Sequence, residues 1–184
     1  MKTEYEVRVL EIDSFDIISK LEDLGAVKEN EYFQRRYVYD FTPIRESEWI
    51  RLRTDGFKTT LTYKNVESKT VDGTKELEIV VDDFDNTNKM LEILGYKCRG
   101  IQENKRIRYI LEGIEIDIDT WPLIPTYLEI EGGSEAEVMN IIDKLNIVRD
   151  KVCTLDVQSI YEHYGIIKED TNYLSFNEGD DKNV

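Results

Sequence analysis

Acidic and basic side chains alternate with apolar ones near the start of the chain. The stretch EYEVR places Glu4, Glu6 and Arg8 two residues apart, with Tyr5 and Val7 between them. Successive side chains of a β-strand point to opposite faces, so this spacing predicts one charged face and one apolar face. Carboxylates can bind divalent cations, and a guanidinium group can bind phosphate oxygens. A half-buried strand with a solvated face would give the same pattern, so repetition elsewhere must distinguish the two interpretations.

The alternation recurs along most of the chain. Acidic residues alternate with apolar ones in ELE (76–78), IEIDID (114–119) and LEIE (128–131), and basic residues do so in WIRLRT (49–54), TLTYKN (60–65) and KRIRYI (105–110). With the first stretch and a long strand around 32–41, about eight strands are predicted. Single-sign clusters gain nothing from facing bulk water, which favours a common interior for these faces.

Amphipathic helices are predicted between these strands, at 13–25, 82–95 and 134–146, and a shorter one at 154–165. Each of the first three follows a strand that carries Glu-x-Glu. If the strands close into a barrel with charged faces inward and apolar faces under the helices, all the clusters meet in one lumen. The acids there would be Glu4, Glu6, Glu76, Glu78, Asp117, Asp119, Glu129 and Glu131, and the bases Arg8, Arg51, Arg53, Lys64, Arg106 and Arg108.

Buried charge at such density is stable only if the acids bind metal ions and the bases bind an anion. Carboxylate ligands without His or Cys indicate Mg²⁺ or Mn²⁺, and Arg with Lys indicates phosphate oxygens. A polyphosphate that chelates one or two metal ions satisfies both sets.

Composition limits the alternatives. The 184 residues suit one domain, expected at 1–167, and an acidic, mobile tail is expected at 168–184. The net charge of −15 argues against nucleic acid and anionic membranes as partners. Cys98 and Cys153 lack the spacing of a zinc or disulfide framework, and His163 is expected at the surface. With neither a signal peptide nor a membrane span in the sequence, we expect a cytoplasmic protein, monomeric or homodimeric.

Taken in order, the motifs resemble the CYTH, or triphosphate tunnel metalloenzyme, superfamily over residues 1–165. They are E-x-E-x-R at 4–8, R-x-R at 51–53, Lys64, the internal E-x-E, K-R-x-R at 105–108, and D-T-W-P followed by Y-L-E-I-E at 119–131. The resemblance implies an α+β fold, with an eight-stranded antiparallel tunnel that binds a triphosphate and a divalent metal. Arg8 departs from the family's usual lysine, and an arginine would replace that lysine poorly in proton handling.

The resemblance also implies a role for each position. The expected metal ligands are Glu4, Glu6, Glu78, Asp119, Glu129 and Glu131; the expected phosphate ligands are Arg8, Arg51, Arg53, Lys64, Lys105, Arg106 and Arg108, of which Arg8 and Lys64 are the catalytic candidates. Which of the three residues at 105–108 face the tunnel is open.

Three functions fit these residues. The first is a metal-dependent triphosphatase acting on tripolyphosphate, thiamine triphosphate or a nucleoside triphosphate. The second is a class IV type adenylate cyclase that makes cyclic AMP and diphosphate from ATP, and the third is a polyphosphate or nucleotide binder without chemistry. Hydrolysis is favoured because water is a less demanding nucleophile than a positioned ribose, and no adenine-binding motif is evident.

Overall fold

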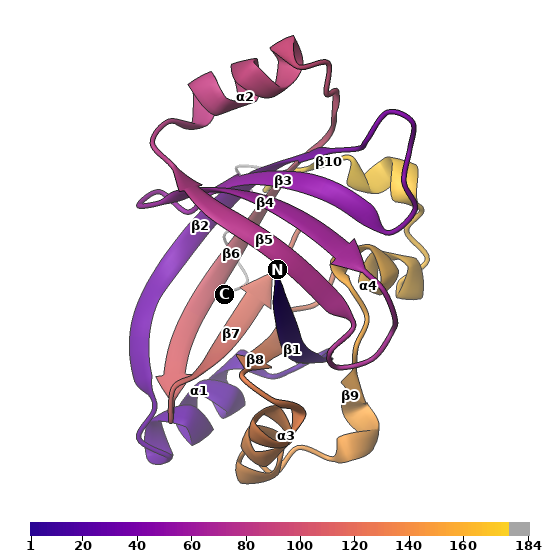
Figure 1. The fold of residues 1–184 in the computed structure, drawn as a ribbon. Coiled ribbons are helices and arrows are strands. Elements are labelled where there is room, and N and C mark those ends of the chain that lie inside the picture. Colours follow the sequence, from indigo (N-terminus) through magenta and orange to yellow (C-terminus); the bar gives the residue numbers. More distant parts are fainter. Residues whose placement is uncertain (177–184) are drawn as a thin grey trace.

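The structure, a computed structural model, describes residues 1–176 of the chain. Eight antiparallel strands form a closed β-barrel, as the sequence predicts (Figure 1). Around the ring they are β1 (Lys2–Val9), β8 (Tyr127–Gly132), β7 (Ile114–Thr120), β6 (Cys98–Leu111), β2 (Val27–Tyr39), β3 (Glu48–Thr54), β4 (Thr59–Val66) and β5 (Thr74–Val81), which returns to β1.

The four predicted helices are present, each within its expected range. They are α1 (Ser14–Asp23), α2 (Phe84–Ile93), α3 (Glu135–Lys144) and α4 (Val157–His163). Each begins after a side chain that accepts a hydrogen bond from a backbone N–H of the first turn: Asp13, Asp83, Ser134 and Asp156. Figure 1 places α1 and α3 at one end of the view and α2 at the other.

The main hydrophobic core lies outside the barrel, between its wall and two helices. The apolar faces of β1, β6, β7 and β8 pack against α1 and α3, with Ile116, Ile130 and Ile141 fully buried there. A smaller cluster joins α2 to β2 and β3 through Phe84 and Leu52. Because the side chains of a strand alternate, this packing directs the charged residues into the barrel.

Strand register then sets charged residues opposite one another inside the barrel. Arg8 of β1 is paired with Glu129 of β8, and Glu129 with Asp117 of β7. On the far side of β7, Asp119 is paired with Arg106 of β6. Residues far apart in sequence therefore become direct neighbours in the lumen.

The chain after α4 packs on the barrel. The expected mobile tail begins at 168, but residues 168–171 form a 3₁₀ turn and β10 (Tyr173–Leu174) pairs in parallel with β6. Leu174 is buried, and Ile101 N donates to Asn172 O at 2.7 Å, which explains this ordering. The remainder of the expected tail, 177–184, lies outside the described residues.

Three further expectations concern individual residues and membrane spans. Cys98 and Cys153 are free thiols, although Cys153 lies in the two-residue strand β9 (Val152–Cys153) that pairs with β1. His163 is exposed, as predicted. Within residues 1–176, the helices are all too short or too polar to cross a membrane.

Candidate functional site

The barrel encloses a cavity of about 840 Å³, a size suited to a small-molecule ligand. Twelve of the thirteen candidate site residues line it, and they come from seven strands: Glu4, Glu6, Arg8, Arg51, Arg53, Lys64, Glu78, Arg106, Arg108, Asp119, Glu129 and Glu131. The alternating charged and apolar residues of the sequence therefore form a barrel wall whose inner face is charged and whose outer face is apolar.

Lys105 is the exception. Arg106 and Arg108 line the cavity, so positions 105 and 107, which alternate with them, point outward. The Lys105 ammonium lies 4.8 Å from the ring centroid of Phe176. Lys105 therefore cannot contact a ligand in the tunnel, and its assignment as a phosphate ligand is corrected. Ile107 and Tyr109 belong to the hydrophobic core outside the barrel, so the positions that alternate with them, Arg106 and Arg108, face inward.

Charges on one side of the lumen are closely paired, and we call this side the paired wall. It comprises six residues from β1, β6, β7 and β8: Arg8, Arg106, Arg108, Asp117, Asp119 and Glu129. Arg106 Nε donates to Asp119 Oδ1 at 2.7 Å, and its Nη2 donates to Glu129 Oε1 at 3.0 Å. Arg108 forms two hydrogen bonds of 2.7 Å with Asp117. Bidentate pairs of this kind are the strong form of charge-assisted hydrogen bond.

Arg8 is fully engaged within this wall. Its Nε donates to Glu129 Oε2 at 2.8 Å, its Nη2 to Glu6 Oε2 at 3.0 Å, and its Nη1 to the Leu155 carbonyl oxygen at 2.7 Å. Burial alone would raise the pKa of Glu129, but Arg8 and Arg106 hold it well below its usual range. Arg8 thus orients two candidate metal ligands and ties the segment before α4 to the barrel.

Arginines on the opposite side are much less closely paired, and we call Arg36, Arg51 and Arg53 the arginine wall. They lie on β2 and β3, where register sets Arg36 opposite Arg53. Arg51 Nη2 lies 3.5 Å from Glu78 Oε2, and Arg53 Nη2 lies 3.7 Å from the same oxygen. Burial and the neighbouring arginines lower the pKa of Arg53 to about 9. This wall carries excess positive charge that the protein itself does not neutralise.

Lys64 of β4 lies between the two walls. Its Nζ contacts Glu4 Oε2 at 2.8 Å and Glu76 Oε2 at 3.2 Å. Burial, helped by Glu76 and Glu6, raises the pKa of Glu4 to about 8 against the opposing effect of Lys64. Two carboxylates therefore share one ammonium group, and added positive charge would relieve their repulsion.

Several hydrogen-bond donors that line the cavity are buried without a partner among residues 1–176. They are Arg36 Nε, Arg51 Nε, Trp121 Nε1 and the hydroxyl groups of Thr60 and Tyr127. An unsatisfied buried donor costs about 1–3 kcal/mol, so five of them in one cavity indicate a ligand rich in acceptor oxygens.

The sequence interpretation missed Arg36, Trp121 and Tyr127 as lining residues. Arg36 was hidden because it adjoins Arg35, and a pair of adjacent arginines does not reveal which one faces inward. The alternation of Tyr32, Gln34 and Arg36 along β2 was the available clue, since all three line the cavity.

The donor set suits a hard divalent cation, because the lumen offers carboxylates rather than thiolates or imidazoles. In residues 1–176 no group of three or more carboxylate, thiol or imidazole side chains is gathered closely enough to hold a metal ion. The carboxylates are instead held by arginine and lysine, so a cation would have to compete with Arg8 and Lys64 for Glu6 and Glu4.

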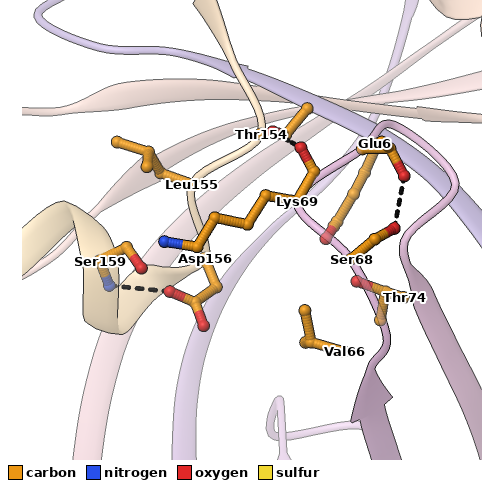
Figure 2. A pocket seen from close by; sticks show the side chains of 10 residues that line it. Glu6, Val66, Ser68, Lys69, Thr74, Thr154, Leu155, Asp156 and Ser159 are labelled. Atoms are coloured by element: carbon orange, nitrogen blue, oxygen red, sulfur yellow. Dashed lines mark hydrogen bonds between the residues drawn. The ribbon is translucent and has the colours of Figure 1, made fainter. Parts of the chain in front are cut away.

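A second, much smaller pocket adjoins the tunnel beside Glu6 (Figure 2). Figure 2 shows Lys69, from the β4–β5 loop, extending toward Asp156 and Ser159 at the start of α4. The backbone oxygen of Lys69 accepts a hydrogen bond from Thr154 Oγ1 at 2.9 Å. At about 40 Å³ the pocket has room for water but not for a substrate, so the barrel cavity is the candidate site.

Together, a closed antiparallel barrel, a hydrophobic core outside it and a charged lumen define a tunnel protein. The CYTH domain family model matches residues 2–154. The chain belongs to this family, which confirms the resemblance seen in its motifs. Among curated proteins, no sequence matches the chain.

Solved structures share the fold at low sequence identity. A Pyrococcus horikoshii protein is 22% identical with a TM-score of 0.74, over 85% of this chain and 98% of that one. A candidate adenylate cyclase from Vibrio parahaemolyticus is 11% identical with a TM-score of 0.75, over 88% and 98%. An adenylyl cyclase candidate from Hippeastrum, described as having a dominant triphosphatase activity, is 14% identical with a TM-score of 0.61, over 91% and 97%.

Proposed function

We propose that the protein is a divalent-metal-dependent phosphohydrolase that acts on a triphosphate bound in the barrel. Tripolyphosphate, thiamine triphosphate and nucleoside triphosphates are the candidate substrates. The observation that carries the proposal is the arginine wall, where Arg36 and Arg51 are buried, Arg53 is partly buried, and all three guanidinium groups lie 3.5 Å or more from any carboxylate in the described chain. A polyphosphate supplies both the negative charge and the acceptor oxygens that this wall lacks.

The two walls would have different roles in binding: the arginine wall would contact the phosphoryl groups, and the paired wall would orient the carboxylates. Arg51 and Arg53 lie two residues apart on one strand, so their side chains can contact neighbouring phosphoryl groups of a linear ligand. Lys64 is already held by Glu4. Because its ammonium group is a point charge with several donors, it can also contact the same ligand. Arg8 and Arg106 hold Glu129 ionised, and Arg106 orients Asp119.

Glu4, Glu6, Glu129 and Glu131 are the residues that would hold Mg²⁺ or Mn²⁺, since they project into one region of the lumen from the neighbouring strands β1 and β8. When bound, a divalent cation neutralises charge on phosphoryl oxygens and activates water for attack on phosphorus. Burial is the main reason that the pKa of Glu4 is raised, and a cation in this region would oppose that effect and the smaller ones of Glu76 and Glu6.

Cyclisation of ATP is the second candidate, because the Vibrio parahaemolyticus neighbour is described as a candidate adenylate cyclase. Two considerations favour hydrolysis. The arginine wall offers three guanidinium groups that can bind phosphoryl oxygens, and the Hippeastrum neighbour is described as having a dominant triphosphatase activity.

Product analysis tests the proposal. The protein is incubated separately with tripolyphosphate and with ATP, each with Mg²⁺ or Mn²⁺ and with a chelator as control, and products are resolved by anion-exchange chromatography. We expect orthophosphate release that requires metal and is lost in Glu4→Gln. Equal amounts of cyclic AMP and diphosphate from ATP would establish the cyclase instead, and no product from either substrate would leave a binding protein.

A further inference from the structure

The cavity reaches the surface where β2 begins and where β3 turns into β4. It is lined there by Glu29 and Tyr32 of β2 and by Asp55 and Lys58 of the loop between β3 and β4, and we call these four residues the hairpin mouth. Arg53 of the arginine wall lies two residues before Asp55, a distance of roughly 7 Å along the chain. One small ligand can therefore contact both the arginine wall and the hairpin mouth.

A break in the register of β2 directs Glu29 toward the cavity. Tyr32 and Gln34 line the cavity, so strict alternation would place Glu29 on the outer face. The pairing of β2 with β6 shifts by one residue between Lys28 and Asn30, which leaves Glu29 unpaired, as in a β-bulge. Bulges redirect side chains and are frequent beside functional sites. The local backbone of β2 therefore adds an acidic side chain to the hairpin mouth.

The two carboxylates of the hairpin mouth bond only to neutral groups. Glu29 Oε2 accepts a hydrogen bond from the Tyr32 hydroxyl at 3.0 Å. Asp55 Oδ1 accepts from the backbone N–H of Phe57 at 2.9 Å and from that of Lys58 at 2.8 Å. Among residues 1–176, neither carboxylate forms an ion pair, so both add uncompensated negative charge to the mouth.

The cations near the hairpin mouth have carboxylate partners. Arg108, which lies near Tyr32, donates two hydrogen bonds to Asp117 and approaches Glu115 Oε2 at 2.6 Å. The ammonium group of Lys58 lies 3.9 Å from Glu78 Oε1. The mouth therefore has an excess of negative charge, opposite in sign to the excess of the arginine wall.

Tyr32 provides a fixed aromatic surface at this mouth. Its ring packs edge to face against that of Phe57, with the centroids 6.2 Å apart, and Glu29 holds its hydroxyl. Just inside the mouth, Thr60 of β4 lies opposite Arg53, and its hydroxyl is buried without a partner in the described chain. A fixed ring, free carboxylates and an unsatisfied hydroxyl in one cavity are features of a ligand subsite.

We propose that the hairpin mouth is a specificity subsite for a cationic heteroaromatic group joined to the triphosphate. This inference rests on the proposed function and selects thiamine triphosphate among its candidate substrates. The thiazolium ring of that compound is permanently charged and is joined to the phosphate by a short hydroxyethyl arm. It would gain from the face of Tyr32 and from the charges of Glu29 and Asp55. Adenine is uncharged at neutral pH, and tripolyphosphate has no group to place there.

The outer face of β2 supplies matched control variants. Glu31 and Phe33 alternate with Tyr32 and are exposed on the outside of the barrel. Glu31→Gln removes the same charge as Glu29→Gln, and Phe33→Leu removes an aromatic ring as Tyr32→Leu does, without touching the cavity. Asp55 is left unchanged because its side chain holds the turn between β3 and β4.

Calorimetric titrations with a chelator present measure binding without turnover. Thiamine triphosphate, ATP and tripolyphosphate are titrated into the wild type and the four variants, and melting temperatures verify that each variant is folded. The first two ligands are both triphosphate monoesters, so comparing them isolates the organic group. We expect the wild type to bind thiamine triphosphate at least about fivefold more tightly than ATP, the scale of one cation–π contact. Glu29→Gln and Tyr32→Leu should each remove most of this preference and leave tripolyphosphate binding unchanged within about twofold.

The outcomes separate this inference from the proposed function. Equal binding of thiamine triphosphate and ATP by the wild type overturns the inference alone. A preference that persists in both Glu29→Gln and Tyr32→Leu, or that is lost equally in Glu31→Gln or Phe33→Leu, also overturns it. If the wild type binds none of the three ligands, the proposed function fails as well. A preference lost in the two mouth variants and kept in the two controls supports the subsite.

Discussion

The paired wall and the arginine wall both place arginines inside the barrel, but only the paired wall neutralises them with nearby carboxylates. In the paired wall, Arg8 and Arg106 each meet carboxylate oxygens at 3.0 Å or less. In the arginine wall, the shortest guanidinium–carboxylate distance is 3.5 Å, and Arg36 has no carboxylate contact in the described chain. The first wall is complete as it stands, whereas the second needs an anion.

This difference separates stability from function within one barrel. Breaking a buried ion pair leaves an uncompensated charge and is strongly destabilising. Removing a cation that repels its neighbours costs little stability but removes a ligand contact. Substitutions in the paired wall should therefore mainly affect folding, and substitutions in the arginine wall should mainly affect binding.

The largest effect is expected from Arg106→Met. This change leaves Asp117, Asp119 and Glu129 buried without their shared cation, so the free energy of unfolding should fall by about 3–5 kcal/mol. Urea denaturation followed by circular dichroism measures it, with Arg108→Met as a more exposed comparison on the same strand. Wild-type stability of Arg106→Met would show that the two walls do not differ as described.

Arg51→Ala and Arg53→Ala should weaken ligand binding and leave the free energy of unfolding nearly unchanged. Each should weaken tripolyphosphate binding by at least about 1.5 kcal/mol, the scale of one charge-assisted hydrogen bond, while stability changes by less than about 1 kcal/mol. Lys64→Ala should weaken binding to a similar degree but also free Glu4 and Glu76 from their cation. Thermal melts with tripolyphosphate, and with sulfate as a control, would show a smaller ligand-induced shift in each variant. Equal shifts with sulfate would contradict a triphosphate-specific wall.

Glu4→Gln tests the region between the walls through the pH dependence of stability. An ordinary glutamate titrates near 4.5, but the pKa of Glu4 in the folded protein is about 8. The folded state therefore favours the protonated form, and the stability that this proton contributes is present below about 4.5 and is lost as pH rises through 8. In metal-free buffer, the melting temperature of the wild type should fall between pH 6 and 9, and Glu4→Gln should flatten that decline.

The same variant should lose turnover and the stabilisation that Mn²⁺ gives, without unfolding. Glu129→Gln offers a contrast, since Glu129 accepts hydrogen bonds from both Arg8 and Arg106 and its loss should destabilise the fold. Activity of Glu4→Gln at the wild-type level would remove Glu4 from the metal ligands.

The smallest effect is expected from Lys105→Ala. Lys105 lies on the outer face of β6, so its removal should leave tripolyphosphate binding unchanged within about twofold. Arg106 and Arg108, its neighbours in the same motif, provide the contrast. A tenfold loss of affinity in Lys105→Ala would mean that the inner face of β6 has been assigned to the wrong register.

The fold could be predicted because two periodicities agree along the chain. Alternating charge in 4–8, 51–53 and 114–119 marks the inner face, and the helices begin at side-chain caps such as Asp13 and Ser134 that sequence shows directly. What sequence could not give is pairing across the lumen. Arg8 resembles a phosphate ligand by position, yet register places it opposite Glu129. Its side chain also donates a hydrogen bond to the carbonyl oxygen of Leu155, in the segment before α4.

Two other features also depended on tertiary contacts. Residues 168–176 lack periodicity, so the sequence does not predict their packing, which rests on the buried Leu174 and on hydrogen bonds such as Gln102 Nε2 to Thr171 O. Arg36 needed a register to distinguish it from Arg35. Sequence thus identifies which residues are charged and inward, and only the structure shows which charges remain unpaired.

A crystal structure of the protein with imidotriphosphate, a triphosphate analogue that resists hydrolysis, tests the central claim most directly. We predict density for three phosphoryl groups against the arginine wall, while the ion pairs of Arg8 and Arg106 stay in place. An analogue bound instead to Arg8 or Arg106 with those pairs broken, or bound only outside the barrel, would contradict the assignment of the arginine wall as the anion site.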